Sequence, residues 1–290
     1  ANISFFLYCL MKQSIKELLF SAVAFIFSYS IAYLTGIELV KNAVLLAFII
    51  QWILYIPAYL LQTEKFYDIS GSITYISVVS YCFINNYDSQ NLDIGNVILS
   101  VIIIAWALRL GSFLFFRIKK AGEDIRFREI KKSPTRFFMT WTLQGMWVSL
   151  CSACALAGIA KGIIINSYFY FGLTVFLIGF IVEIIADNQK TKFRSNPENK
   201  DKFINSGLWK FSRHPNYMGE ILLWLGISII SLSSLERFEM ATLISPLFTY
   251  LLLVYVSGIR ILEHNGDKKW GHLDSYKSYK ENTPRLIGFL

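Results

Sequence analysis

Long apolar stretches alternate with short polar or basic segments along the whole chain. Eight of these stretches have roughly the 17 to 25 residues that an α-helix needs to cross a bilayer. The third and the seventh are short, and either could form a tilted or re-entrant helix. The pattern predicts an all-α fold, a polytopic transmembrane helical bundle of about seven to eight spans. The stretches run near residues 17–35, 42–62, 69–86, 96–117, 138–158, 165–186, 217–234 and 240–258.

Composition agrees with this pattern. The chain has 290 residues, 54% of them apolar and 17% charged, and a mean hydropathy of +0.47. A soluble domain of this length is less hydrophobic, whereas a multi-pass membrane protein has such values. We therefore expect residues 1–290 to form a single integral-membrane domain. Within it we expect N-terminal spans (residues 1–62), substrate-side spans with a basic loop (63–137) and a cofactor-binding C-terminal half (138–290).

Basic residues gather in the long polar segments and in the C-terminal tail, whereas the other connections are short. By the positive-inside rule, the basic segments and both termini lie in the cytoplasm. We therefore expect a multi-pass protein of the bacterial inner membrane or the endoplasmic reticulum, with its active site facing the cytoplasm. This orientation and contacts with membrane lipids explain the net charge of +8, and no motif for nucleic-acid binding accompanies it. The basic segments are 117–136, 187–213 and the tail from Arg260 onward.

One polar segment lies immediately ahead of an apolar run. The sequence GLWKFSRHPNYMGE, residues 207–220, precedes ILLWLGISIISL. Polar side chains at the mouth of a membrane span are costly unless they face a ligand, a partner or water. The alternative is an interfacial anchor in which Lys210 and Arg213 reach lipid phosphates. Since an anchor needs no Asn or Glu, we expect a polar ligand to be bound by Arg213, His214, Asn216, Tyr217 and Glu220.

A second set of polar side chains follows the sixth stretch. Steps of four, three and four residues place Glu183, Asp187, Lys190 and Arg194 on one helical stripe. Carboxylates accept hydrogen bonds from ribose hydroxyls or amino groups, and Lys and Arg hold phosphate, so the stripe suits a dinucleotide. Surface ion pairs are the alternative. Since no GxGxxG follows a strand and no GxxxxGK[ST] occurs, the membrane bundle and its loops would have to hold the nucleotide.

Several predicted spans carry polar groups at one depth, near their cytoplasmic ends. Such groups indicate a ligand- or water-filled cavity open to the cytoplasm, although a structural network of ion pairs gives the same pattern. Arg109 and Arg117 belong to the fourth stretch and are further candidates for cofactor binding. Cys151 and Cys154 lack nearby ligand residues, so no metal site is expected. The polar groups at this depth are those of Glu64, Tyr67, Asp68, Arg109, Gln144, Glu183 and Glu220.

Together these segments resemble a known family of membrane enzymes. GLWKFSRHPNYMGEILLWLG, with ADNQKTKFR before it and SGIRILE and YKSYKENTP after it, is similar to the C-terminal half of the steroid 5-alpha-reductase superfamily (3-oxo-5-alpha-steroid 4-dehydrogenase C-terminal-like). WALRLGSFLFFRIKKAGEDIRF and EKFYDISGSITY resemble its branch of largely uncharacterised integral-membrane proteins, so the likeness covers most of residues 60–285. It implies a helical membrane fold and NADPH-dependent reduction of a C=C bond conjugated to a carbonyl, in a lipophilic substrate such as a 3-oxo-4-ene steroid.

The resemblance also implies which residues contact the cofactor. The family has an Asp followed seven residues later by an Arg, an Asn followed four residues later by a Glu, and a C-terminal tyrosine. Glu183 stands where vertebrate 5-alpha-reductases usually have Asn. The matching cofactor residues here are Asp187 with Arg194, Asn216 with Glu220, and Tyr279, with Tyr276 as the other candidate tyrosine.

The catalytic carboxylate of the family corresponds most closely to Glu64. Its catalytic tyrosine has no match, because Trp106 occupies the nearest position, and Tyr67 is the residue that could take its place. Hydride addition to an enone places negative charge on the carbonyl oxygen, so the site needs a hydrogen-bond donor there. Tyr67 beside Glu64 or Asp68 would polarise that oxygen and supply a proton. Alternatively, Asp68 could cap the third helix.

Two other classes of function stay open. RHPxYxGE also resembles isoprenylcysteine carboxyl methyltransferases, which bind S-adenosylmethionine, so a methyltransferase of lipids or prenylated thiols is the alternative enzyme. That family favours a Glu-Glu pair near the last span, where this chain has Leu262-Glu263-His264. A lipid-binding or sensor protein without catalytic activity would show the same pattern. The expected partners are a lipophilic, steroid-like enone substrate and membrane lipids, with no obligate protein partner.

Overall fold

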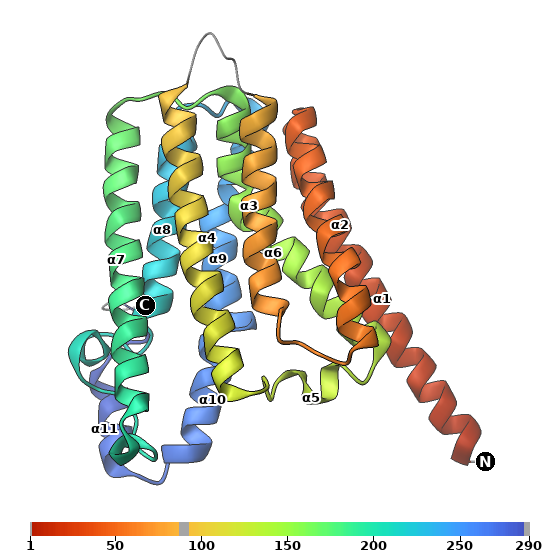
Figure 1. Ribbon diagram of the computed structural model, residues 1–290, viewed down its shortest axis with the longest axis vertical. Helices are drawn as coiled ribbons and strands as arrows, with labels where there is room; N and C mark the ends of the chain where they lie inside the picture. Colours follow the sequence, from red (N-terminus) through yellow and green to blue (C-terminus); the bar gives the residue numbers. More distant parts are fainter. Residues whose placement is uncertain (1, 87–92, 287–290) are drawn as a thin grey trace. The chain divides into compact units, whose positions relative to one another are not determined.

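The computed structural model describes residues 2–86 and 93–286, with side chains from residue 11 onward (Figure 1). In these ranges every regular element is helical, and seven helices are long and apolar enough to cross a membrane. The predicted all-α, multi-pass membrane fold is therefore confirmed. The chain forms two compact units. Unit 1 contains residues 1–164 and 231–244, and unit 2 contains residues 165–230 and 245–290.

Unit 1 is organised around α6, which contacts α1, α2 and α3. In the most apolar window of α6, 78% of the residues are buried, compared with 28–33% in α1, α2 and α4. The other helices therefore display apolar side chains outward, as membrane spans do, while α6 forms the core. The elements of unit 1 are α1 (Asn2–Leu34), α2 (Glu38–Leu60), α3 (Tyr67–Asn85), α4 (Ile94–Ala121), α5 (Phe127–Ile130), α6 (Pro134–Lys161) and the 3-10 segment η3 (Arg237–Leu243).

The third predicted stretch forms α3, which is not one of the seven candidate spans. Its hydroxyl groups face neighbouring helices: the Thr74 hydroxyl donates to Ser70 O (2.7 Å) and accepts from Gln51 Nε2 of α2 (2.8 Å). A Cβ on Gly111 of α4 would lie 2.4 Å from Ser72 Oγ, so the two helices approach closely at this glycine. Small and hydroxyl-bearing residues let membrane helices pack in this way. They also lower the hydropathy of α3 without removing it from the bundle.

Local sequence determines where several helices begin. Asp93 accepts a hydrogen bond from the N–H three residues later (2.9 Å) at the start of α4, and Ser133 does the same (3.3 Å) for α6. Pro134 follows as the first residue of α6, where its missing N–H is tolerated. Asn166 caps the next long helix by accepting from two N–H groups. These caps satisfy donors that have no partner inside the helix.

Unit 2 is built on α7 and α8, which approach each other at four glycines. The glycines are seven residues apart on each helix, Gly172 and Gly179 on α7 and Gly219 and Gly226 on α8. A Cβ on Gly179 would lie 2.6 Å from Gly219 O, so backbone meets backbone. The elements of unit 2 are α7 (Ser167–Ser195), η1 (Pro197–Asn199), η2 (Gly207–Lys210), α8 (Pro215–Leu232), α9 (Ile244–Leu251), the π-helical segment η4 (Leu252–Val256), α10 (Ile259–Trp270) and α11 (Asp274–Asn282); the last two residues of α8 and the first residue of α9 belong to unit 1.

We expect Gly179→Ala and Gly219→Ala each to lower the melting temperature of the purified protein in detergent. The added methyl group would meet a backbone carbonyl at 2.6 Å, and overpacking of this kind costs about 1–3 kcal/mol. Leu225→Ala changes an exposed position of α8 and is the control. Wild-type melting of both glycine variants would show that α7 and α8 are not in close contact there.

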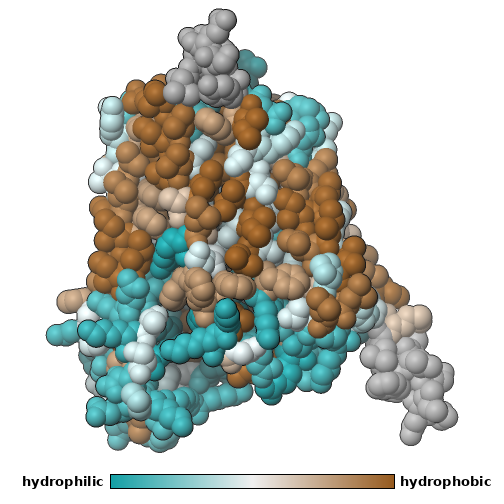
Figure 2. All heavy atoms as spheres, in the orientation of Figure 1, coloured by the Kyte–Doolittle hydropathy of each residue, from teal (hydrophilic) through white to brown (hydrophobic). Residues whose placement is uncertain are grey.

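Hydrophobic and hydrophilic residues occupy different parts of the surface in both units (Figure 2). Hydrophobic residues cover the long helices, whereas hydrophilic residues gather around α5 in unit 1 and around α11 in unit 2. Charged side chains are costly in hydrocarbon, so they collect where a helix leaves it. Each unit therefore has one strongly polar end.

Candidate functional site

The predicted stripe on α7 runs from buried carboxylates to an exposed cation. Glu183 and Asp187 are 2% and 6% exposed, Lys190 is half-buried and Arg194 is exposed. Buried carboxylates on a membrane helix are rare and usually face a functional site. This gradient places the acidic groups inside unit 2 and the basic groups toward water.

The segment before α8 is fixed to this stripe by its preceding turn, η2. Trp209 is buried, and its indole N–H donates to Ala186 O of α7 (3.1 Å). Lys190 Nζ lies 4.7 Å from the centre of the Trp209 ring, and Gln189 Oε1 accepts from the Leu208 N–H (2.9 Å). A tryptophan docked under a lysine in this way contributes packing and a cation–π contact. The turn thus positions Arg213 and the residues that follow it against α7.

The close approach of α7 and α8 brings the two predicted sets of polar residues together. A Cβ on Gly219 would lie 2.7 Å from Glu183 N, so the backbone of Glu183 lies directly beside α8. Glu220 follows Gly219 and is 6% exposed, and Asn216 lies one turn earlier in the same helix. The structure therefore places the α7 stripe and residues 213–217, which we call the RHPNY segment, side by side in unit 2.

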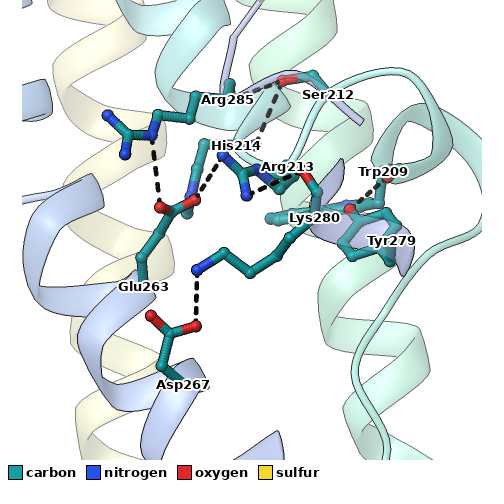
Figure 3. A network of polar contacts seen from close by, with 9 residues as sticks. All are labelled: Trp209, Ser212, Arg213, His214, Glu263, Asp267, Tyr279, Lys280 and Arg285. Carbon is teal, nitrogen blue, oxygen red and sulfur yellow. Dashed lines mark hydrogen bonds and ion pairs between the residues drawn. The ribbon is translucent and has the colours of Figure 1, made fainter. Parts of the chain in front are cut away.

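A carboxylate that sequence reasoning did not assign to the site is central to this region (Figure 3). Glu263 of α10 accepts through Oε1 from Arg213 Nη2 (3.1 Å) and contacts His214 Nε2 (3.4 Å). Its Oε2 lies 3.4 Å from Arg285 Nε. One carboxylate thus contacts two guanidinium groups and an imidazole, and its negative charge offsets the repulsion between the two guanidinium groups. The available signal was an acidic residue that follows the last predicted span within five positions, in a segment rich in basic residues.

The backbone of the RHPNY segment is also held by the C-terminal residues. The Arg213 N–H donates to Pro284 O (2.9 Å), and the His214 N–H donates to Arg285 O (3.2 Å). Lys280 of α11 forms an ion pair with Asp267 of α10 (2.6 Å; Figure 3). The chain before α8 is therefore held by α7, through η2, and also by residues 284 and 285. These contacts fix its side chains in one arrangement.

Three buried polar atoms of this segment have no hydrogen-bond partner among the described residues: Arg213 Nε, His214 Nδ1 and Asn216 Oδ1. Burial lowers the pKa of the His214 imidazole below its usual range, and the hydrogen bond with Glu263 offsets only part of this effect. The ring is therefore neutral at pH 7, and if Nε2–H donates to Glu263, Nδ1 is an acceptor. Buried polar atoms normally have partners, so these atoms point to a ligand or water.

The aromatic residues around the segment have distinct roles. The Tyr279 hydroxyl donates to Trp209 O (2.5 Å), which ties α11 to η2. Tyr276 is buried, and its ring lies 5.1 Å from that of Phe203. Burial raises the pKa of each of these tyrosines to about 12, so both hydroxyls are protonated donors at neutral pH. Tyr217 stacks on His214 with ring centres 5.9 Å apart.

The predicted catalytic residues lie in unit 1, where α3 begins. Glu64 is 4% exposed and lies in the turn before α3. Its Oε2 binds Lys131 Nζ (2.7 Å), and its Oε1 accepts from the Asp124 N–H (3.0 Å). Both oxygens therefore accept hydrogen bonds from the 122–133 segment. The backbone N–H of Tyr67 donates to Glu64 O (2.9 Å), so residues 64–67 form a turn that leads into α3.

Tyr67 and Asp68 occupy the first turn of α3. The Tyr67 hydroxyl donates to Thr140 O (3.1 Å), and the centre of its ring lies 4.8 Å from that of Phe127 and 5.3 Å from that of Trp141. Asp68 lies 3.9 Å from Arg117. The N-cap position of α3 is Phe66, so Asp68 does not occupy the capping position considered for it.

The remaining two predicted cofactor residues belong to unit 1 and lie apart from the unit 2 group in the chain. Arg109 is half-buried on α4, with its guanidinium 5.4 Å from the centre of the Phe113 ring. Arg117 is exposed and pairs with Asp68. Within unit 2, by contrast, the structure brings together the predicted residues of α7, the RHPNY segment and α11.

Comparison with known proteins places these residues in context. The family model described as "Protein of unknown function (DUF1295)" matches residues 54–283. 3-oxo-5-alpha-steroid 4-dehydrogenase 1 of Mus musculus is 26% identical over 122 residues, 42% of each chain. Delta(14)-sterol reductase of Arabidopsis thaliana is 32% identical over 100 residues, 31% of this chain and 25% of that protein.

A third relative has a different printed activity. Probable O-methyltransferase ustE of Ustilaginoidea virens is 31% identical over 84 residues, 28% of this chain and 30% of that protein. The aligned region covers less than half the length of each of these three relatives. No solved structure matches the chain.

Proposed function

The chain belongs to the family described as "Protein of unknown function (DUF1295)", within the steroid 5-alpha-reductase superfamily, and on this basis we propose that it is an NADPH-dependent membrane reductase. Its substrate is a lipophilic molecule with a C=C bond conjugated to a carbonyl, such as a 3-oxo-4-ene steroid. The active site faces the cytoplasm. The two relatives whose names describe steroid or sterol oxidoreductases support this reaction class.

The observation that carries the proposal is the set of buried polar atoms in unit 2. Asn216 Oδ1 is an acceptor, Arg213 Nε is a donor, and His214 Nδ1 is an acceptor in the tautomer whose Nε2–H donates to Glu263. Acceptors suit the hydroxyl and amide N–H groups of a dinucleotide, and a guanidinium suits its phosphates. Lys190 and Arg194 extend the basic side of the same region toward water. The donor and acceptor types therefore fit NADPH.

Each group of residues has a defined role in this proposal. NADPH, when bound, would supply a hydride to the carbon β to the substrate carbonyl. Unit 2 residues bind it: carboxylates accept from its hydroxyl and amino groups, and basic side chains pair with its phosphates. These residues are Glu183, Asp187, Lys190, Arg194, Arg213, His214, Asn216, Tyr217, Glu220, Tyr276 and Tyr279.

Proton transfer is assigned to unit 1. The Tyr67 hydroxyl is a neutral donor that can turn from Thr140 O, its acceptor at 3.1 Å, to a substrate carbonyl. Such a donor stabilises the negative charge that develops on that oxygen. Glu64 and Asp68 lie on either side of Tyr67 in sequence and set the electrostatic environment of the hydroxyl. The rings of Phe127 and Trp141 pack against that of Tyr67, which is half-buried.

The cofactor assignment is tested by thermal stabilisation. A ligand that binds only the folded state raises the melting temperature. We expect NADPH to raise it for the purified protein in mild detergent and S-adenosylmethionine to leave it unchanged. NADH is the matched control for the extra phosphate and should have a smaller effect. Mass spectrometry of molecules that co-purify provides an independent identification.

The second candidate is an S-adenosylmethionine-dependent methyltransferase of lipids or prenylated thiols. It is favoured by the relative named as a probable O-methyltransferase and by the RHPNYMGE segment. Against it, this chain has only Glu263 where that family favours a Glu-Glu pair, and the carboxylate of Glu263 binds Arg213 and Arg285. Stabilisation by S-adenosylmethionine and not by NADPH would favour this candidate over the reductase.

A further inference from the structure

The polar end of unit 1 contains a regular set of ion pairs. Residues 63–68 and 115–136 carry nine basic and five acidic side chains. Every one of the five carboxylates pairs with a different basic residue, so none is left to neutralise another cation. The pairs are Glu64–Lys131, Asp68–Arg117, Glu123–Arg128, Asp124–Arg126 and Glu129–Lys132.

Two of the basic residues outside this set line one cavity. Lys65, in the link between α2 and α3, and Lys119, in the last turn of α4, border a hollow of about 290 Å³ together with Phe115. Neither lysine forms an ion pair with any described residue, although Glu64 and Asp68 lie nearby in sequence. The hollow therefore carries two uncompensated positive charges beside a phenyl ring.

The position of the hollow matches the boundary between hydrocarbon and water. Lys65 follows the end of the candidate span Glu38–Leu60, and Lys119 lies in the last turns of Ile94–Ala121. Apolar side chains next to them in the chain are strongly exposed, with Leu60 at 74%, Leu61 at 70% and Phe116 at 65%. Exposed apolar surface of this kind contacts acyl chains, and the lysines lie where headgroups are found.

We propose that this hollow, the Lys65–Lys119 site, binds the headgroup of an anionic phospholipid. The phosphate lies between the two ammonium groups, and the glycerol backbone packs on Phe115. A zwitterionic headgroup carries a positive charge that the two lysines repel, so it would bind less tightly. The ion-pair pattern gives the selectivity, because every carboxylate that could have neutralised these lysines is already paired. None of these observations depends on the proposed reaction.

The test is native mass spectrometry of the purified protein, released from detergent micelles that contain equal amounts of phosphatidylglycerol and phosphatidylcholine. The wild type should retain phosphatidylglycerol preferentially. Lys65→Gln/Lys119→Gln should reduce this retention by roughly tenfold or more, since each basic side chain near an anionic headgroup contributes appreciably to binding. Lys65→Arg/Lys119→Arg should preserve it.

The matched control is Lys120→Gln/Arg136→Gln, which removes the same charge from exposed positions of the same segment that do not line the hollow. It should retain the lipid as the wild type does. Equal loss in both glutamine pairs would overturn the proposal, since a diffuse basic surface would then explain binding. Displacement of the lipid from the wild type by millimolar NADPH or inorganic phosphate would also overturn it, because the lysines would then be a site for soluble phosphate.

Discussion

Tyr67→Phe is expected to slow turnover by about 10²- to 10³-fold, the usual effect of removing one donor that stabilises an oxyanion. The ring remains, so its packing against Phe127 and Trp141 is kept, and only the hydrogen bond to Thr140 O is lost from the resting structure. NADPH affinity should therefore stay close to that of the wild type. The measurement is NADPH oxidation against a panel of 3-oxo-4-ene steroids and simpler lipophilic enones.

Glu64→Gln is expected to slow the same reaction, and its control comes from the structure. Glu64 binds Lys131 and the Asp124 N–H, so its replacement also loosens the 122–133 segment. Lys131→Gln breaks the same ion pair without touching the carboxylate. If Glu64 acts on the substrate, Glu64→Gln will be much slower than Lys131→Gln. Equal losses of rate in Glu64→Gln and Lys131→Gln would mean that Glu64 only anchors the 122–133 segment. Wild-type rates for Tyr67→Phe would show that the Tyr67 hydroxyl takes no part in the mechanism.

The spans could be predicted from sequence because crossing a membrane depends on a local property, the length of an apolar stretch. The predicted stretch at 138–158 became α6, the buried core of unit 1, although its sequence is less apolar than those of α1, α2 and α4, which are mostly exposed. Burial depends on which helices surround it. The third stretch was predicted as a short span with hydroxyl groups, and α3 uses those groups to pack against α2 and α4.

The candidate site was predictable where its residues follow one another in the chain. Helical spacing aligned Glu183 with Asp187, and the position of Asn216 ahead of an apolar run marked the start of α8. Glu263 was not assigned because its partner His214 lies 49 residues away, and helical spacing gives no information at that separation. The pairing of Glu64 with Lys131, 67 residues later, could not be predicted for the same reason.

The residues of α7 are expected to affect binding before rate. Asp187 is buried on α7, and we assign it to the cofactor. Asp187→Ala should therefore raise the NADPH concentration needed for half-maximal turnover, with the rate recovering at high cofactor. This is the opposite of the pattern expected for Tyr67→Phe. If both variants show the same defect, the assignment of Asp187 to the cofactor and of Tyr67 to proton donation is wrong.

Asn216→Ala and Glu220→Ala are each expected to weaken NADPH binding by about 1–3 kcal/mol, or roughly five- to 150-fold in Kd. Asn216 gives the sharper test, because its Oδ1 is buried and has no partner among the described residues. Removing it should leave the melting temperature of the cofactor-free protein nearly unchanged. Glu263→Gln should lower that temperature, since Glu263 holds Arg213, His214 and Arg285. Lys210→Gln, at an exposed position of η2, is the control and should bind NADPH normally. Normal binding by both Asn216→Ala and Glu220→Ala would make the segment an interfacial anchor, whose polar side chains meet water and lipid phosphate in place of a cofactor.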